Sequence, residues 1–254
     1  MAYSKQTIEK VIKSSLVKID TFYKEKINNY IGKTSDTKEY YSEIIAYEIL
    51  NNLAPFEGIK KITRNSKDKS YYTKSHHNGK ISINEASNRH EENYAKKLFN
   101  KKIEHNNLGK IIDFQIPLKD EKNDKAGKFD LMVFNEKTLT LYLIELKYGG
   151  NQETLLRAIL EIHTYCKIIN HENLKNDFST TMQENINTKI NINEIVIKPA
   201  VMVVKEAEKK DCKSYTELEE LEKGERINLK KLAKDLEITF FKSATGETFE
   251  MIYF

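Results

Sequence analysis

The chain has 254 residues, of which 39% are hydrophobic and 31% are charged, and its formal net charge is +4. A chain of this length can bury a sizeable core in one large domain or in one domain with an appendage. The two cysteines, Cys166 and Cys212, exclude a disulfide framework and a zinc site built on paired cysteines. No apolar run approaches the roughly 20 residues that a membrane span needs, so we expect a soluble, cytoplasmic protein with no membrane partner.

The N-terminal region is expected to be helical. Apolar side chains recur at spacings of three and four over residues 8–30, which predicts one long amphipathic helix that Gly32 ends. Asp36 and Glu39 form a capping-box pattern, and a second helix is predicted from there to about Leu53. These helices could make a homodimer or a packed cap on the core. The cap is favoured because apolar stripes usually serve a protein's own core.

Residues 59–110 form a strongly basic segment, with thirteen Lys and Arg against five Asp and Glu, a net charge of +8. Its portion 65–84 has no helical period, which predicts a long exposed loop or ribbon. Basic side chains there, Lys74 among them, could contact phosphates, and Tyr71 and Tyr72 could stack on unpaired bases. A solvated loop without a ligand is the alternative, because charge runs are common on surfaces.

A helix is predicted over residues 85–102, with Ala95, Leu98 and Phe99 on its inner face. Glu91 lies four residues before Ala95 and seven before Leu98, so it shares that face. A glutamate on the inner face of a helix is not expected unless it has a function there. The alternative is an ordinary exposed glutamate in the first turn, since helix boundaries are uncertain by two to four residues.

Two apolar segments on either side of a short turn at 135–138 predict a pair of adjacent antiparallel strands over residues 127–150. Glu145 and Lys147 share one face of the second strand with Leu143, because strand side chains alternate. Asp130 sits among apolar residues on the first strand. If the hairpin closes in register, these three charged groups meet in space.

Charged groups inside apolar strands are costly unless they are paired or hold a metal. Two neighbouring carboxylates repel each other, and a divalent cation such as Mg²⁺, or Mn²⁺, relieves that repulsion with hard oxygen ligands. The ion could polarise a phosphoryl oxygen, while Lys147 orients water or neutralises charge. These parts suit a phosphodiester hydrolase. The alternative is a hairpin with a half-exposed, salt-bridged face.

The rest of the chain predicts more helices and strands around this hairpin. Asn151 could cap a helix over 152–169, on which Arg157, Glu161 and Tyr165 lie four apart. Arg157 could reach a phosphate or pair with Glu161 on the surface. The other predicted elements are a first core strand at 111–118, an irregular connection with some helix at 171–193, a core strand at 194–205, a largely exposed helix or loop at 209–223, a short helix at 227–236, and strands at 237–241 and 249–254.

The spacing of Asp130, fourteen intervening residues and Glu145-Leu146-Lys147 resembles the motif of the PD-(D/E)xK nuclease superfamily, whose core is similar to that of type II restriction enzymes. Phe129 stands where the name-giving Pro would be. Some branches of the family carry Gln and, four residues later, Tyr on the helix after the motif; this chain has Glu161 with Tyr165.

The resemblance implies an α/β fold with an αβββαβ core, a mixed central sheet flanked by helices. It covers roughly residues 85–205; residues 1–84 would be a helical N-terminal extension with a basic loop, and 206–254 an elaboration of the same domain by helix and strand. It also implies a Mg²⁺ site, Mn²⁺ being an alternative ion, held by Asp130 and Glu145 with the Leu146 carbonyl. The helix acid that joins them would be Glu91, with Glu92 second.

The expected activity is that of a Mg²⁺-dependent endonuclease, with Asp130, Glu145 and Lys147 as catalytic residues and DNA as the main substrate class. Lys128, Arg157, Tyr165 and Lys74 are the candidate substrate-binding residues. RNA as a substrate stays open. The family suggests a role in defence against foreign DNA or in a mobile element. Two other classes stay open: a non-catalytic nucleic-acid binding module, and a regulatory interaction protein built on the N-terminal helices.

Overall fold

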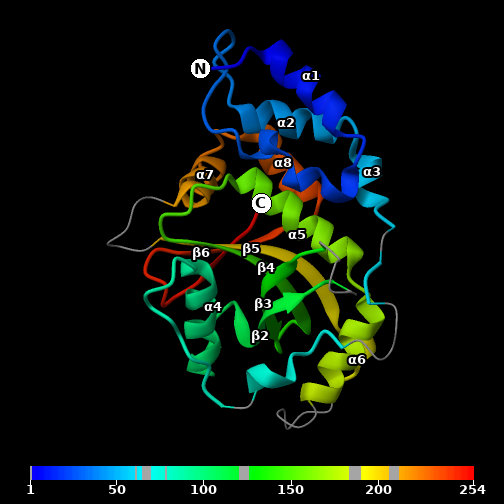
Figure 1. Ribbon diagram of the computed structural model, residues 1–254, viewed down its shortest axis with the longest axis vertical. Helices are drawn as coiled ribbons and strands as arrows, with labels where there is room; N and C mark the ends of the chain where they lie inside the picture. Colours follow the sequence, from blue (N-terminus) through cyan, green and yellow to red (C-terminus); the bar gives the residue numbers. More distant parts are fainter. Residues whose placement is uncertain are drawn as a thin grey trace.

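The structure is a computed structural model that describes residues 2–60, 62–64, 70–77, 79–119, 126–182, 190–205 and 212–254. One mixed β-sheet runs through it, and its strands lie side by side in chain order (Figure 1). Within the described ranges the sheet has seven strands. They are β1 (Glu104–His105), β2 (Gly109–Pro117), β3 (Lys128–Asn135), β4 (Thr140–Tyr148), β5 (Val196–Val204), β6 (Thr239–Ser243) and β7 (Glu250–Ile252).

The sheet is antiparallel at both edges and parallel in its centre. Strands β1 to β4 pair in antiparallel fashion. Strand β5 is parallel to β4, and β6 is parallel to β5, because helical crossovers connect them. Strand β7 closes the sheet as an antiparallel neighbour of β6. The chain therefore has the α/β class expected from its sequence.

Helices cover both faces of the sheet. Helix α4 (His90–Lys101) packs on one face through Ala95, Leu98 and Phe99, as predicted, although it begins five residues later than expected. The opposite face carries α1, α2, α5, α7 and α8, which share the larger of the two hydrophobic clusters (Figure 1). Their bounds are α1 Lys5–Ser15, α2 Tyr41–Leu50, α5 Leu155–Ile168, α7 Lys213–Glu222 and α8 Ile227–Asp235. Leu141 and Leu143 of β4 face this larger cluster, and so do Glu145 and Lys147 by strand alternation.

The long N-terminal helix predicted over 8–30 is broken. Helix α1 ends at Ser15, and two short 3₁₀ helices follow, Ile19–Lys24 and Lys26–Asn29. Their apolar residues still point inward, because spacings of three suit 3₁₀ turns as well as α-turns. The predicted capping box is also wrong, because Asp36 accepts the backbone N–H of Lys5 and does not cap the N-terminus of α2. A separate short helix, α3 (Leu53–Glu57), follows α2.

The N-terminal helices pack on the chain's own core, as the cap interpretation requires. Glu43 of α2 accepts the backbone N–H groups of Asn228 and Leu229 at 2.9 Å each and so caps α8. Arg226 is buried and donates to Ser42 of α2 and to Glu220 of α7. The segment 209–223, expected to be largely exposed, instead contains α7 with a buried apolar face made of Tyr215, Leu218 and Leu221.

Two further details differ from expectation. Thr154 rather than Asn151 caps α5, because its side chain accepts the backbone N–H of Arg157. Tyr71 is fully buried and donates its hydroxyl to the Thr63 carbonyl, so it does not stack on bases. The connection after α5 contains some helix, as expected, in the form of α6 (His171–Met182). None of the helices in the described ranges is long and apolar enough to cross a membrane.

Candidate functional site

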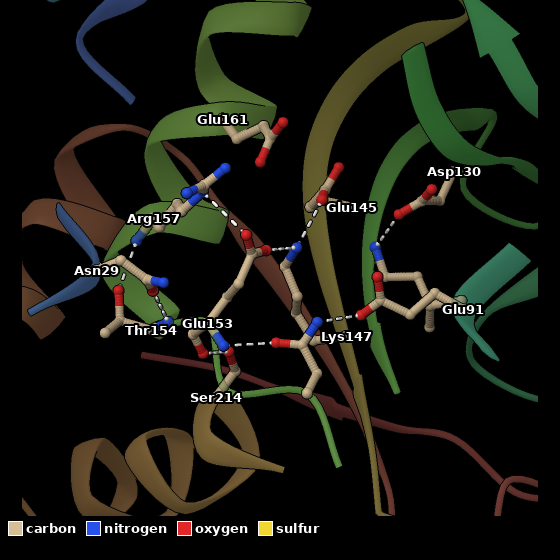
Figure 2. A network of polar contacts seen from close by, with 12 residues as sticks. Asn29, Glu91, Asp130, Glu145, Lys147, Glu153, Thr154, Arg157, Glu161 and Ser214 are labelled. Carbon is tan, nitrogen blue, oxygen red and sulfur yellow. Dashed lines mark hydrogen bonds and ion pairs between the residues drawn. The ribbon is translucent and has the colours of Figure 1, made fainter. Parts of the chain in front are cut away.

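The predicted hairpin closes in the register that brings its acids together. Leu131 of β3 pairs with Ile144 of β4, so Asp130 lies beside Glu145 on the neighbouring strand. The carboxylate of Asp130 accepts the Leu146 backbone N–H at 2.9 Å and the side-chain amide of Gln115, on β2, at 2.5 Å. Asp130 is therefore held from both neighbouring strands; Figure 2 shows its contact with β4.

Glu145 and Lys147 form a buried ion pair. The Lys147 ammonium lies 2.8 Å from Glu145, and the two residues are only 2% and 6% exposed respectively. The alternative of a half-exposed salt-bridged hairpin is thus wrong. A buried ion pair contributes little stability over apolar residues, so stability alone does not explain its presence here.

Glu153, which the sequence did not single out, binds the same lysine. Its carboxylate lies 2.5 Å from the Lys147 ammonium and 3.1 Å from Arg157 Nε. Arg157 therefore pairs with Glu153 rather than with Glu161. Figure 2 shows Glu153 and Arg157 on one side of Lys147, and Asp130 and Glu91 on the other.

Glu91 comes from α4, which covers the opposite face of the sheet, and reaches the site at the end of β4. Its carboxylate accepts the Tyr148 backbone N–H at 3.3 Å and the Asn151 side-chain amide at 2.6 Å. The carbonyl oxygen of the same Asn151 side chain accepts the Glu153 backbone N–H at 2.6 Å. Glu91 is therefore not the ordinary exposed glutamate of the alternative, and Asn151 links it to Glu153.

Glu161 and Tyr165 form the edge of the site on α5. The Tyr165 hydroxyl donates to Glu161 at 2.7 Å and lies 3.3 Å from the hydroxyl of Tyr23. Tyr165 is only 3% exposed, so it holds Glu161 rather than lining an open surface for substrate. Its expected place among the substrate contacts stays a prediction.

Five carboxyl groups face two cations in this cluster, which we call the acidic centre: Glu91, Asp130, Glu145, Glu153 and Glu161, with Lys147 and Arg157. Burial raises the pKa of Glu91 to about 7, and it also raises the pKa of Asp130 and of Glu145, to which the Glu161 charge adds. A bound cation, or protonation of some of these carboxyl groups, relieves the repulsion between them.

Lys147 remains protonated in this environment. Burial alone would lower the pKa of its ammonium, but the charges of Glu145, Glu91 and Glu153 outweigh burial and raise it well above the usual value. The same ion pairing lowers the pKa of Glu153 against the opposing effect of burial. Lys147 is therefore a donor of positive charge and hydrogen bonds, not a base.

The residues of the acidic centre fit a hard divalent cation, because all of its anionic donors are carboxylate oxygens. Carboxylate oxygens of Glu145, Glu153 and Glu161 lie within 4.8 Å of one another. Among the described residues, the expected set of Asp130, Glu145 and Glu91 does not converge as closely. Glu145 belongs to both sets. Gln115 adds a buried side-chain oxygen that has no hydrogen-bond partner among the described residues.

Gln115 is held in an unusual backbone conformation. Its φ is +50° inside strand β2, a left-handed value that is uncommon for a residue other than glycine. Such conformations cluster at functional sites, where surrounding structure maintains them. The conformation accompanies the hydrogen bond of Gln115 to Asp130, a contact that no pattern in the sequence indicates.

A cleft opens beside Asp130 and Glu91. Lys128 and Arg89 line it, together with Gln115. Glu145 and Lys147 are buried and do not line it. Of the predicted substrate contacts, Lys128 lies in the cleft and Arg157 beside Glu153, whereas the side chain of Lys74 lies outside the described part of the chain.

Comparisons with protein-family models, with curated proteins and with solved structures found no match. What the site can do therefore rests on its own geometry.

The contact between Gly127 and Tyr165 gives a first prediction. Gly127 has a φ of +89°, and a Cβ added there would lie 2.4 Å from the Tyr165 hydroxyl. We expect Gly127→Ala to lower the free energy of unfolding, because it adds both backbone strain, about 1–2 kcal/mol, and a clash costing about 1–3 kcal/mol. Urea denaturation measures this. Gly224→Ala is the matched control, with a φ of +80° and open space around its Cβ; equal losses in the two variants would contradict the prediction.

The raised pKa of Glu91 gives a second prediction, for the metal-free protein. A carboxyl whose folded-state pKa is raised from 4.5 to about 7 stabilises the fold below pH 4.5, and this contribution is lost as pH rises towards 7. Glu91→Gln keeps an acceptor for Tyr148 and Asn151 but carries no charge. We expect it to be more stable than the parent at pH 8 by up to about 3 kcal/mol, and to differ little at pH 4.5.

Chemical denaturation of metal-free protein at pH 4.5 and pH 8 measures the effect. The matched control is Glu104→Gln, since Glu104 lies exposed on β1 and should show no such gain. A Glu91→Gln variant that is less stable than the parent at pH 8 would show that Glu91 does not carry a strained charge.

Proposed function

We propose that this protein is a metal-dependent nuclease that hydrolyses phosphodiester bonds, with DNA as its main substrate class. The observation that carries the proposal is the meeting of Asp130, Glu145 and Lys147 at adjoining positions of β3 and β4, with the acid and the lysine buried. A purely structural role does not need an uncompensated excess of carboxylates, because buried charges are costly.

The arrangement of elements supports the same proposal. The order α4, β2, β3, β4, α5, β5, with β2 to β4 antiparallel and β5 parallel to β4, agrees with the αβββαβ core of the PD-(D/E)xK superfamily. Within the described residues, three elements are additional to that order: the short strand β1, the helix α6 and a 3₁₀ helix at Ile192–Glu194. Agreement between element order and motif placement carries more weight than either alone.

In this mechanism Asp130 and Glu145 would hold Mg²⁺ or Mn²⁺, and Glu91 and the Leu146 carbonyl would assist them. The chemistry that such an ion would supply is polarisation of the phosphoryl oxygen and a lower pKa for the attacking water. Lys147 keeps its proton, so its part is to orient that water and to stabilise negative charge on the phosphoryl group. Its ammonium has three N–H donors; Glu145 and Glu153 accept two, which leaves one without a partner among the described residues.

The experiment that tests the proposal is a cleavage assay on circular duplex DNA, linear single-stranded DNA and RNA, with Mg²⁺, Mn²⁺ or EDTA. We expect cleavage of DNA that requires the metal and stops with EDTA. If no nucleic acid is cut under any of these conditions, the proposal is wrong, and a non-catalytic binding or regulatory role becomes the better account.

A further inference from the structure

We propose that Arg89 and Lys128 form a binding site for a backbone phosphate of the nucleic-acid strand, next to the phosphate that reacts at Asp130. The inference rests on the proposed function, because it names how the substrate strand is held at that site. Arg89 immediately precedes α4, and Lys128 begins β3. The two side chains line the same cleft as Asp130.

Three cationic side chains converge on one carboxylate at this point. Glu92 lies 2.8 Å from the Lys96 ammonium, 3.3 Å from the Arg89 guanidinium and 3.7 Å from the Lys128 ammonium. The three cations and Glu92 together carry a charge of +2. The hydrogen bond from Lys96 is the largest influence that lowers the pKa of Glu92, so its carboxylate stays ionised. Exposed ion pairs add little to stability, so folding does not require this convergence.

The excess positive charge is open to a ligand. The side chains of Arg89 and Lys128 are 74% and 49% exposed, whereas those of Lys96 and Glu92 are each 19% exposed. Lys96, which makes the short contact, can retain Glu92. Arg89 and Lys128 make the two long contacts and can turn to an anion in the cleft without leaving a buried charge unpaired.

The position suits a phosphate next to the reacting one. Lys128 and Asp130 are two residues apart on β3, so their backbone positions lie about 6.8 Å apart along the strand, and both residues line the cleft. This is close to the spacing of successive phosphates on an extended nucleic-acid strand. A phosphate accepts hydrogen bonds from a planar guanidinium and from an ammonium. Glu92 occupies the place of that phosphate in the free protein and competes with it.

The test measures binding without cleavage. A fluorescein-labelled oligonucleotide, single-stranded or duplex, is titrated with protein in EDTA over a range of salt concentrations, and anisotropy gives the Kd. The double variant Arg89→Gln with Lys128→Gln should bind at least tenfold more weakly at low salt, and the slope of log K against log salt should fall by about one. Glu92→Gln should bind several-fold more tightly, because the competing carboxylate is gone.

Lys101→Gln is the matched control. It removes one positive charge from the last turn of the same helix, where Lys101 pairs with Glu247, and should leave the salt slope unchanged. Circular dichroism confirms that each variant is folded. An unchanged Kd in the double variant, weaker binding by Glu92→Gln, or no binding of nucleic acid by the parent would each overturn the phosphate site. The binding assay contains no metal and measures no cleavage. If the protein binds nucleic acid but does not cut it, the predicted changes in Kd should still be observed.

Discussion

Replacing Glu145 with Gln is expected to lower the rate of metal-dependent cleavage by roughly 10²–10³-fold, the magnitude seen when one charge-stabilising group is removed from a transition state. Glu145 belongs both to the metal-binding set expected from the sequence and to the close cluster with Glu153 and Glu161. It also contacts Lys147 at 2.8 Å. The amide has nearly the same shape but no charge, so it binds a hard cation poorly. The rate is measured on the DNA substrate that the parent cuts best.

Folding should survive this substitution, because Glu153 still holds Lys147 at 2.5 Å and one source of repulsion with Glu161 is removed. Glu250→Gln is a suitable control: Glu250 is an exposed glutamate on strand β7 of the same sheet, and its variant should cut at the parent rate. Full activity in a folded Glu145→Gln protein would show that the buried pair is not catalytic.

Replacing Lys147 with Met is expected to lower the free energy of unfolding by about 3–5 kcal/mol at pH 8, the usual cost of leaving the partner of a buried ion pair unpaired. Both Glu145 and Glu153 lose their ammonium partner in this variant. Burial then raises the pKa of the Glu145 carboxyl without opposition, while only Arg157 still opposes it at Glu153. Metal-dependent cleavage should disappear as well.

The sign of the pH dependence distinguishes this explanation from simple loss of packing. Carboxyls with raised folded-state pKa values stabilise the fold at low pH and lose that contribution as pH rises. The deficit of Lys147→Met should therefore shrink when pH falls from 8 to 5, as measured by chemical denaturation. A deficit that stays constant would contradict the ion-pair account. Lys101→Met, which breaks an exposed pair with Glu247, should leave the free energy of unfolding almost unchanged at either pH.

The hairpin was predictable because its information is local. Strand alternation alone places Glu145 and Lys147 on one face, and the short turn between the strands sets the register that brings Asp130 beside them. The sequence predicted the helix acid only as a choice between Glu91 and Glu92. In the structure Glu91 reaches the acidic centre, whereas Glu92, one residue later on the helix, points to Arg89, Lys96 and Lys128.

The remaining parts of the site depend on contacts distant in sequence. Glu153 reaches Lys147 only because the chain turns after β4 and Asn151 fixes the backbone N–H of Glu153. Gln115 reaches Asp130 from the neighbouring strand through a left-handed backbone that no residue pattern specifies. In α7, charged residues such as Glu217 suggested an exposed face, but Glu217 is buried beside Arg226 and accepts the Leu155 backbone N–H. A prediction from hydrophobic periodicity treats charged residues as solvent-facing, so it could not find the burial of Glu217.

The central claim is that the carboxylates at the junction of β3 and β4 bind a divalent cation, and calorimetric titration with Mn²⁺ at pH 8 tests it most directly because no substrate needs to be known. We predict that the parent binds Mn²⁺ and that Asp130→Asn and Glu145→Gln, both folded, bind it at least tenfold more weakly. A parent protein that binds no Mn²⁺, or variants that bind it as tightly as the parent, would contradict the account.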